Sequence, residues 1–173
     1  SSDADEIKEW IEQTREFRHI QDGADDFPLQ YFFDVREAIK RIRLENTHLE
    51  ESELFDLRRS LQTINDIVRY LNRAEDKGED VDPAPLYPAL YRLTQDVATY
   101  PQLVQGIDQI LDKFGHIRDN ASPELLNIRR ELARAESSVS KTLYSILRSA
   151  QSEGLVDKDV TPTLRDGRLV IPV

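Results

Sequence analysis

The sequence predicts a mainly α-helical protein with a multi-helix core, one long projecting helix and a C-terminal β-hairpin. Three observations support this fold class. Apolar residues recur every three or four positions through most of the 173 residues, which is the spacing of amphipathic helices. Only six glycines are present, too few for a loop-rich all-β fold. Near the C-terminus an Asp-Gly pair lies between apolar residues, a strong signal for a hairpin turn.

The first helix is expected to begin at Asp3 or Asp5 and to end near Gly23. Its apolar residues share one face: Ile7, Trp10, Ile11, Thr14, Phe17 and Ile20. A second helix is expected from about Asp34, after the aromatic cluster Tyr31-Phe32-Phe33. Clustered aromatics can stack on nucleic-acid bases. No lysine or arginine is interleaved with them, so we favour packing in the core.

A third, longer helix is predicted by an apolar stripe of the kind that usually forms a bundle core: Leu54, Leu57, Leu61, Ile64, Val68 and Leu71. Residues 75–82 then form an acidic loop. An EF-hand beginning at Asp76 is excluded, because Tyr87 stands where the bidentate glutamate should be. Three prolines are expected to keep the chain open as far as residue 89. A short helix is predicted over 90–97 and a fifth over 103–114.

The long helix has a well-defined start. Ser122 can cap free backbone N–H groups, Pro123 suits the first helical position, and Glu124 favours the positive end of the helix dipole. A helix over 123–152 measures about 45 Å at about 1.5 Å per residue. Seven residues recur along it at alternating steps of three and four, as in a coiled coil. We call them the apolar seam: Leu125, Ile128, Leu132, Ala135, Val139, Thr142 and Ile146.

The hairpin is predicted from residues 163–165 and 168–171, which flank Asp166 and Gly167. Pro172 lacks the N–H that an internal strand needs, so the second strand should lie at an edge there. This strand is still apolar at its last residue, which leads us to expect more chain beyond it.

Arg165 and Arg168 occupy paired positions beside the turn, where two positive charges repel each other slightly. A salt bridge to Asp166, to Asp159 or to a neighbour outside this sequence could relieve this repulsion, and we favour that interpretation. The alternative is contact with a nucleic-acid backbone or a neighbouring domain, for which Lys158, Arg165 and Arg168 are the candidate residues.

Composition argues against several classes of function. The chain has no cysteine, which excludes disulfides and thiolate metal sites. Its three histidines are isolated, and it contains no HExxH motif and no glycine-rich phosphate loop. We therefore expect no catalytic, cofactor-binding or metal site in this segment. No apolar run approaches about 18 residues, so we expect no membrane partner and a cytoplasmic location.

Charge is unevenly distributed along the chain. The net charge is −10, with 13 basic against 25 acidic residues over 1–112 and 10 against 8 over 113–173. An acidic surface repels nucleic acid. The C-terminal part is therefore the only part that would not repel a polyanion outright.

Two sequence blocks lie about 40 residues apart. The first is Gly115-x-Ile117-x-Asp119-x-Ala121-Ser122-Pro123-Glu124-Leu125-x-x-Ile128-Arg129. The second is Thr161-x-x-Leu164-Arg165-Asp166-Gly167-Arg168-x-Val170-Ile171-Pro172-Val173. Together they resemble the MutS superfamily of DNA mismatch repair proteins. The likeness is to the bacterial branch that carries a C-terminal Smr nuclease domain and lacks the mismatch-reading domain. It extends more weakly upstream, through residues 31–36 and 53–54.

The resemblance implies a core and lever segment from a larger protein. Residues 1–118 would be the helical core domain, 119–155 the long lever helix, and 156–173 a β-hairpin leading toward a clamp-like element. The parent protein in that family is a homodimeric ATPase, with an endonuclease domain, that embraces branched or distorted DNA. ATP and magnesium are expected in the parent only. The expected partners are the clamp and ATPase domains of the same protein, with DNA contacted through the parent.

A different interpretation is a free-standing helical adaptor that binds a partner helix along residues 54–71 or 125–146. In either case the apolar seam lacks a covering helix within this sequence. We therefore expect concentration-dependent dimerisation through Leu132, Val139 and Ile146. We expect no DNA binding by this chain alone.

Overall fold

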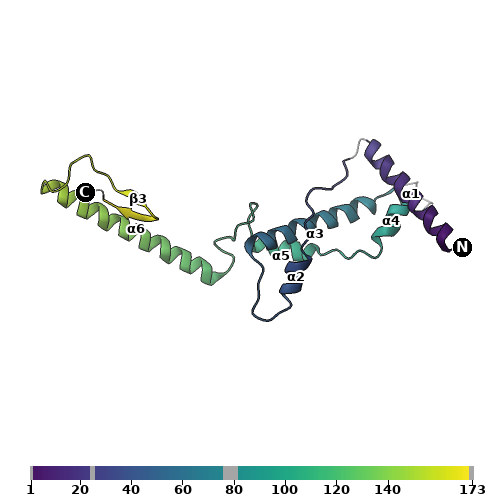
Figure 1. Cartoon of the computed structure of the whole chain (residues 1–173), viewed down its shortest axis with the longest axis horizontal. Coiled ribbons are helices and arrows are strands. Elements are labelled where there is room, and N and C mark those ends of the chain that lie inside the picture. The colour runs from purple at the N-terminus through teal and green to yellow at the C-terminus, as the bar shows by residue number, and fades with distance from the viewer. Residues whose placement is uncertain (1, 24–25, 76–81, 172–173) are drawn as a thin grey trace. The chain divides into compact units, whose positions relative to one another are not determined.

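A computed structural model describes residues 2–23, 26–75 and 82–171 (Figure 1). Its helices are α1 (Ser2–Asp22), α2 (Arg36–Arg41), α3 (Glu51–Leu71), α4 (Pro88–Thr94), α5 (Pro101–Ile110) and α6 (Pro123–Ser152). Its strands are β1 (Ala74–Glu75), β2 (Ala84–Pro85), β3 (Thr163–Arg165) and β4 (Arg168–Val170). The predicted mainly helical fold with a C-terminal hairpin is confirmed. Contacts divide the chain into two compact units, Ser1–Arg118 and Asp119–Val173.

In the first unit, α4 and α5 both pack against α3, and α1 packs against α4 (Figure 1). The core cluster contains four buried side chains from three helices: Ile20, Tyr70, Leu71 and Leu90. Partly buried apolar side chains pack around them: Phe17, Phe27, Ile67 and Tyr87. Burial of apolar surface at this small junction fixes the end of α1 against the end of α3.

Polar side chains on α3 hold the extended segments that cross it. Ser60, Thr63 and Asn65 are buried, and each accepts a hydrogen bond from a backbone N–H far away in sequence. The donors and acceptors are Phe33 N to Ser60 Oγ (2.9 Å), Tyr31 N to Thr63 Oγ1 (3.3 Å) and Tyr100 N to Asn65 Oδ1 (3.3 Å). Because a buried polar group is costly when unpaired, these contacts dock otherwise irregular chain onto α3.

The aromatic cluster does not pack as the sequence predicted. Tyr31 and Phe32 are 51% and 67% exposed, so core packing is wrong for both. The guanidinium of Arg59 lies over three rings instead, 4.8 Å from the centre of Tyr31, 4.4 Å from Phe33 and 4.3 Å from Phe55. A guanidinium is attracted to the electron-rich faces of aromatic rings. An arginine distant in sequence therefore gathers these side chains at the surface.

Several helix boundaries differ from those predicted. The second helix begins at Arg36, because Asp34 accepts a hydrogen bond from the Arg36 backbone N–H at 3.2 Å. The side-chain hydrogen bond from the Arg36 guanidinium, reinforced by this backbone bond, lowers the pKa of Asp34 to about 2. The fourth helix ends before Val97, and the fifth ends at Ile110 rather than at residue 114. The excluded EF-hand at Asp76 falls outside the described residues.

A short strand pairing was also missed, since the prolines were expected to keep this stretch open. Ala74 pairs with Pro85 and Glu75 with Ala84, in antiparallel register. Proline donates no backbone N–H, so a ladder that contains Pro85 is expected to be short.

The tight turn after α5 requires a glycine. Asp112 accepts hydrogen bonds from the backbone N–H groups of Phe114 (2.8 Å) and His116 (3.0 Å), and that of His116 is the main cause of its lowered pKa. Between them Gly115 has φ +83°, and a Cβ at this position would lie 2.5 Å from the ring of Phe55. Both the backbone conformation and the space exclude a side chain here.

We predict that Gly115→Ala destabilises the first unit by more than about 2 kcal/mol, because it adds a strained positive φ to a steric clash. The matched control is Gly106→Ala in α5, where an added Cβ meets nothing within 4 Å. That change should be neutral or stabilise by roughly 0.5 to 1 kcal/mol, since alanine favours helix. Urea unfolding followed by far-UV circular dichroism compares the two. Equal stability of both variants would show that the Gly115 turn is not constrained.

Candidate functional site: the long helix and its hairpin

The long helix α6 begins at the predicted capping sequence. The side-chain oxygen of Ser122 accepts the backbone N–H of Leu125 at 3.1 Å, and Pro123 occupies the first turn. Glu124 places a negative charge in the same turn, where the helix dipole favours it. These three residues therefore fix where the helix starts.

The apolar seam of α6 is uncovered. Ile128, Leu132, Val139 and Ile146 are 61%, 57%, 63% and 56% exposed. From residue 128 to 146 this stripe extends about 27 Å along the helix, at about 1.5 Å per residue. Large apolar side chains in a continuous exposed row are the usual mark of a surface that binds another protein element.

A neighbouring face of α6 is the one that the second unit buries. Leu147 is 4% exposed, and Leu143, one turn earlier, is half-buried. The chain that follows the helix folds back beside its second half (Figure 1). Leu147 was missed because it falls outside the three-four pattern of the seam, although it lies only one residue from Ile146. Its spacing of four from Leu143 is the signal that could have identified this second face.

The side chain of Gln151 fixes the returning chain at the end of the helix. Its amide nitrogen donates to the backbone carbonyls of Asp157 (3.1 Å), Lys158 (3.3 Å) and Val160 (3.1 Å). Gly154, with φ +73°, allows the chain to reverse directly after α6. Nothing in the sequence pattern alone indicated this role for a glutamine.

The β3–β4 hairpin forms at the predicted turn. Asp166 and Gly167 have φ values of +49° and +73°, as a two-residue hairpin turn of type I′ requires. Leu164 pairs with Leu169 in antiparallel register. The described strand ends at Val170, and the prediction about Pro172 falls outside the described residues.

The hairpin brings two of the three candidate cations together. Arg165 pairs directly with Arg168, and both are exposed. Within residues 2–23, 26–75 and 82–171, neither forms an ion pair, so a salt bridge to Asp166 or Asp159 is not made, and a partner outside this sequence stays a prediction. Lys158, the third candidate, is exposed on the returning chain, where its backbone carbonyl accepts a hydrogen bond from Gln151. The two arginines are thus open to an anionic partner.

The first unit contains a separate pocket of about 470 Å³ between α3 and α5. Two of its cations, Arg58 and Arg118, have polar partners, and Lys113, which also lines the pocket, lies over the ring of Phe114. Arg58 makes two hydrogen bonds to the carboxylate of Asp108 (2.7 and 3.0 Å), and that side-chain bond raises the pKa of Arg58. Arg118 donates through Nε to the carbonyls of Asp108 and Leu111. We interpret this pocket as a contact between α3 and α5 centred on the ion pair of Arg58 and Asp108.

Two structural features are absent from the described residues. No group of three or more histidine, aspartate or glutamate side chains there is placed to hold a metal ion. No described helix combines the length and apolar character needed to cross a membrane. The long helix and its hairpin, with their exposed apolar seam and paired arginines, are the strongest candidate for a functional surface.

Comparison with curated proteins gives similarity along the whole chain. Endonuclease MutS2 of Geobacillus sp. is 28% identical over 173 residues, which is all of this chain and 21% of the relative. Endonuclease MutS2 of Enterococcus faecalis is 27% identical over 172 residues, 99% of this chain and 21% of the relative. The putative endonuclease MutS2 of Bacillus subtilis is 27% identical over 173 residues, with the same coverage as the first. The chain thus spans about a fifth of the length of these relatives.

No family model matches the chain, and no solved structure matches it either. The resemblance to the MutS superfamily inferred from two short blocks is confirmed by these relatives, because the similarity covers every element of the fold rather than the blocks alone.

Proposed function

We propose that this chain, which is related to the MutS2 proteins along its whole length, is a non-catalytic core and lever module of a larger MutS-type protein. In this proposal the larger protein acts on DNA and hydrolyses ATP. The helix α6 is the lever that transmits motion between a clamp that contacts DNA and an ATPase that closes a dimer. The matched relatives are about five times longer than the matched region, which leaves room for both parts.

The observation that carries the proposal is the character of α6. It has 30 residues, a capped N-terminus and one buried face in its second half, and it is the only helix among the described residues of its unit. A stiff helix of this length transmits displacement well, because its backbone hydrogen bonds resist bending. Enclosing a substrate requires elements on several sides, which this unit lacks among its described residues.

The exposed apolar seam supports the proposal that α6 is attached to other parts of a larger protein. A lever must be attached along its length, and the seam offers about 27 Å of apolar surface for another helix of the same larger protein. In the isolated chain that surface is uncovered. Self-association through Leu132, Val139 and Ile146 is the expected consequence.

We predict that Val139→Lys/Ile146→Lys weakens self-association by about tenfold or more, because charges replace apolar contacts in the seam. Sedimentation equilibrium over a range of protein concentrations measures it. The matched control is Ser137→Lys/Ser145→Lys, which adds the same charge on another exposed face of α6. If the wild-type chain self-associates and the seam substitutions leave that association unchanged, this role of the seam is contradicted.

We predict that a proline in the middle of α6 uncouples the proposed larger protein. Ser137→Pro removes a helical hydrogen bond and kinks the helix, at a cost of about 3 kcal/mol. DNA stimulation of ATP hydrolysis should fall to the unstimulated rate, whereas hydrolysis without DNA should persist. Ser137→Ala keeps the helix and serves as the control. Full DNA stimulation in the proline variant would exclude a lever role for α6.

We predict that the chain alone does not bind DNA at low salt, because its net charge of −10 opposes the two hairpin arginines. The test compares a four-way DNA junction with plain duplex in a salt titration. Arg165→Ala/Arg168→Ala is the comparison variant. Salt-sensitive binding that this double variant loses would reveal a direct nucleic-acid contact on the hairpin and overturn the prediction.

A free-standing adaptor that binds a partner helix is the second candidate, and the same exposed seam favours it. The two proposals differ in what covers the seam. The seam of a lever is covered by another part of the same larger protein, so that protein should not bind an added peptide with the seam sequence. An adaptor should bind such a helix in trans, with affinity that the seam substitutions remove.

A further inference from the structure

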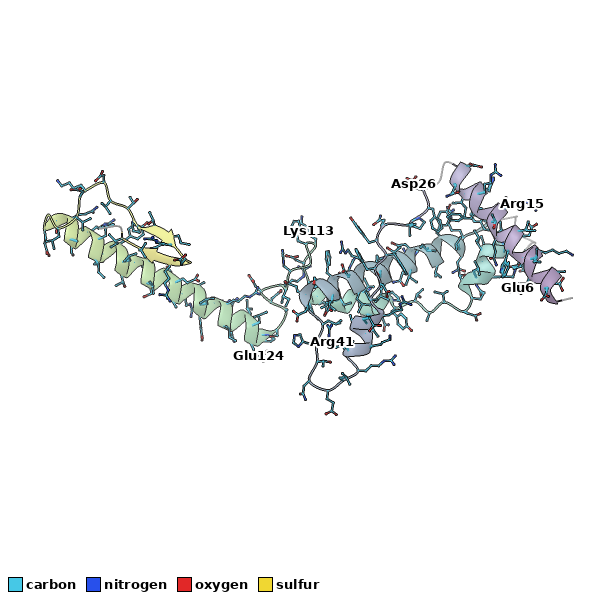
Figure 2. All side chains as sticks on the ribbon, viewed as in Figure 1. Glu6, Arg15, Asp26, Arg41, Lys113 and Glu124 are labelled. Carbon is cyan, nitrogen blue, oxygen red and sulfur yellow. The ribbon has the colours of Figure 1, made fainter. Side chains whose placement is uncertain are left out.

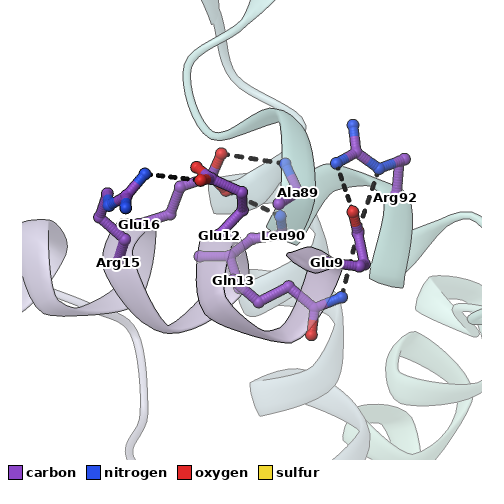
Figure 3. A network of polar contacts seen from close by, with 8 residues as sticks. All are labelled: Glu9, Glu12, Gln13, Arg15, Glu16, Ala89, Leu90 and Arg92. Atoms are coloured by element: carbon purple, nitrogen blue, oxygen red, sulfur yellow. Dashed lines mark hydrogen bonds and ion pairs between the residues drawn. The ribbon is translucent and has the colours of Figure 1, made fainter. Parts of the chain in front are cut away.

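The first helix, α1, has two faces of different character. Its inner face contacts α4, as Figure 3 shows. Glu16 accepts hydrogen bonds from the first free N–H groups of α4, those of Ala89 (3.0 Å) and Leu90 (2.9 Å). Glu9 forms a two-bonded ion pair with Arg92 on the same side, at 3.0 and 2.7 Å. These contacts determine which face of α1 remains outside.

The outer face carries large apolar side chains. Three of them lie within two turns of one another and are more than half exposed: Ile7 (52%), Trp10 (58%) and Ile11 (52%). A shallow groove of about 420 Å³ follows this face, and its lining consists of Ile7, Trp10, Ile11, Thr14, Arg15 and Arg18. An exposed tryptophan flanked by two isoleucines is the composition of an interface centre rather than of an ordinary surface.

The charges beside this face are arranged symmetrically about its midpoint. Acidic Asp3 and Glu6 lie toward the N-terminus, and basic Arg15 and Arg18 lie toward the C-terminus; Figure 2 labels Glu6 and Arg15. Asp3 and Arg18 are equally far from the centre of the Trp10–Ile11 pair, and so are Glu6 and Arg15. Ile7 and Thr14 are equidistant from it as well.

We propose that the outer face of α1 pairs antiparallel with α1 of a second copy of this chain. A twofold axis through the Trp10–Ile11 midpoint places the Trp10 side chains of the two copies beside each other on one edge of the contact, and the Ile11 side chains on the other edge. It also places Asp3 of each copy opposite Arg18 of the other, so that two oppositely charged pairs flank the apolar centre. An isologous interface requires this self-complementarity of a single patch. A parallel pair would place like charges opposite each other, which is unfavourable.

The existing ion pairs of this face leave its charges available. Arg15 contacts Glu12 at 2.5 Å and Arg18 lies 3.9 Å from Asp22, both within α1. The arginine side chains are 69% and 83% exposed, so these pairs contribute little and can be extended by a second copy. One helix pair buries less than the roughly 1,200 Å² of a standard interface, so the dimer is weak.

The pairing is independent of the lever role of α6, and its test is made in the Val139→Lys/Ile146→Lys background, which removes the seam. One variant carries Asp3→Arg, and the other carries Arg18→Glu. Each alone places like charges opposite each other and should dimerise roughly tenfold or more weakly than its parent. An equal mixture restores opposite charges at both pairs and should recover the dimer. A mixture that stays monomeric while the parent dimerises overturns the proposal, and so does a monomeric parent.

The antiparallel direction has its own test, since the chain contains no cysteine. Ile7→Cys and Thr14→Cys chains are prepared separately in the same background, mixed and oxidised. Antiparallel pairing brings residue 7 of one chain opposite residue 14 of the other, within reach of the roughly 3.5–4.5 Å between Cβ atoms that a disulfide needs. The mixed disulfide should therefore exceed either homodimer. Predominance of the two homodimers would show a parallel contact and contradict the proposal.

Discussion

The amphipathic helices of this chain present more apolar surface than their contacts with one another can bury. Among the described residues nine apolar side chains are buried, whereas twenty-three large ones are exposed. Apolar surface is stabilising only when it is removed from water, at about 25 cal/mol per Å². The two longest exposed rows lie on α1 and α6, at opposite ends of the sequence. This imbalance governs both the local packing and the proposed function.

Polar contacts compensate for the small core. In the first unit, the buried hydroxyl and amide groups of α3 dock extended segments, and Glu16 supplies the cap that the short helix α4 lacks. In the second unit, Gln151 holds the returning chain through three backbone carbonyls. Hydrogen bonds of this kind contribute modestly, but losing one partner of a buried pair is expensive. The fold therefore depends on specific polar side chains to a degree that its composition does not reveal.

Local signals were predictable from the sequence, and long-range contacts were not. Ser122, Pro123 and the Asp166-Gly167 pair act on their immediate neighbours, so their positions alone predict a helix start and a turn. The stacking of Arg59 on Tyr31 joins residues from separate segments, and the buried Ser60 looks like any other helical serine. Periodicity identified the seam of α6 correctly as an apolar stripe. It could not show that the neighbouring face of Leu147 is buried while the seam stays open.

The proposed lever and the proposed α1 pair assign different partners to the two exposed rows. The seam of α6 is long and nearly uncharged, which suits a permanent helix of the same larger protein. The outer face of α1 is short and bordered by charges of both signs, which suits a weak contact between copies. Relatives about five times the length of the matched region are consistent with the first assignment. The second depends only on residues of this chain.

The most direct measurement of the central proposal is amide hydrogen exchange along α6, made in the 173-residue chain and in the larger protein proposed to contain it. Exchange rates report the local free energy of opening. If another helix covers the seam, amides between residues 128 and 146 should exchange about a hundredfold more slowly in the larger protein, because opening there must also break the packing. Equal rates in both would contradict the account, since the seam would then be uncovered even in its complete setting.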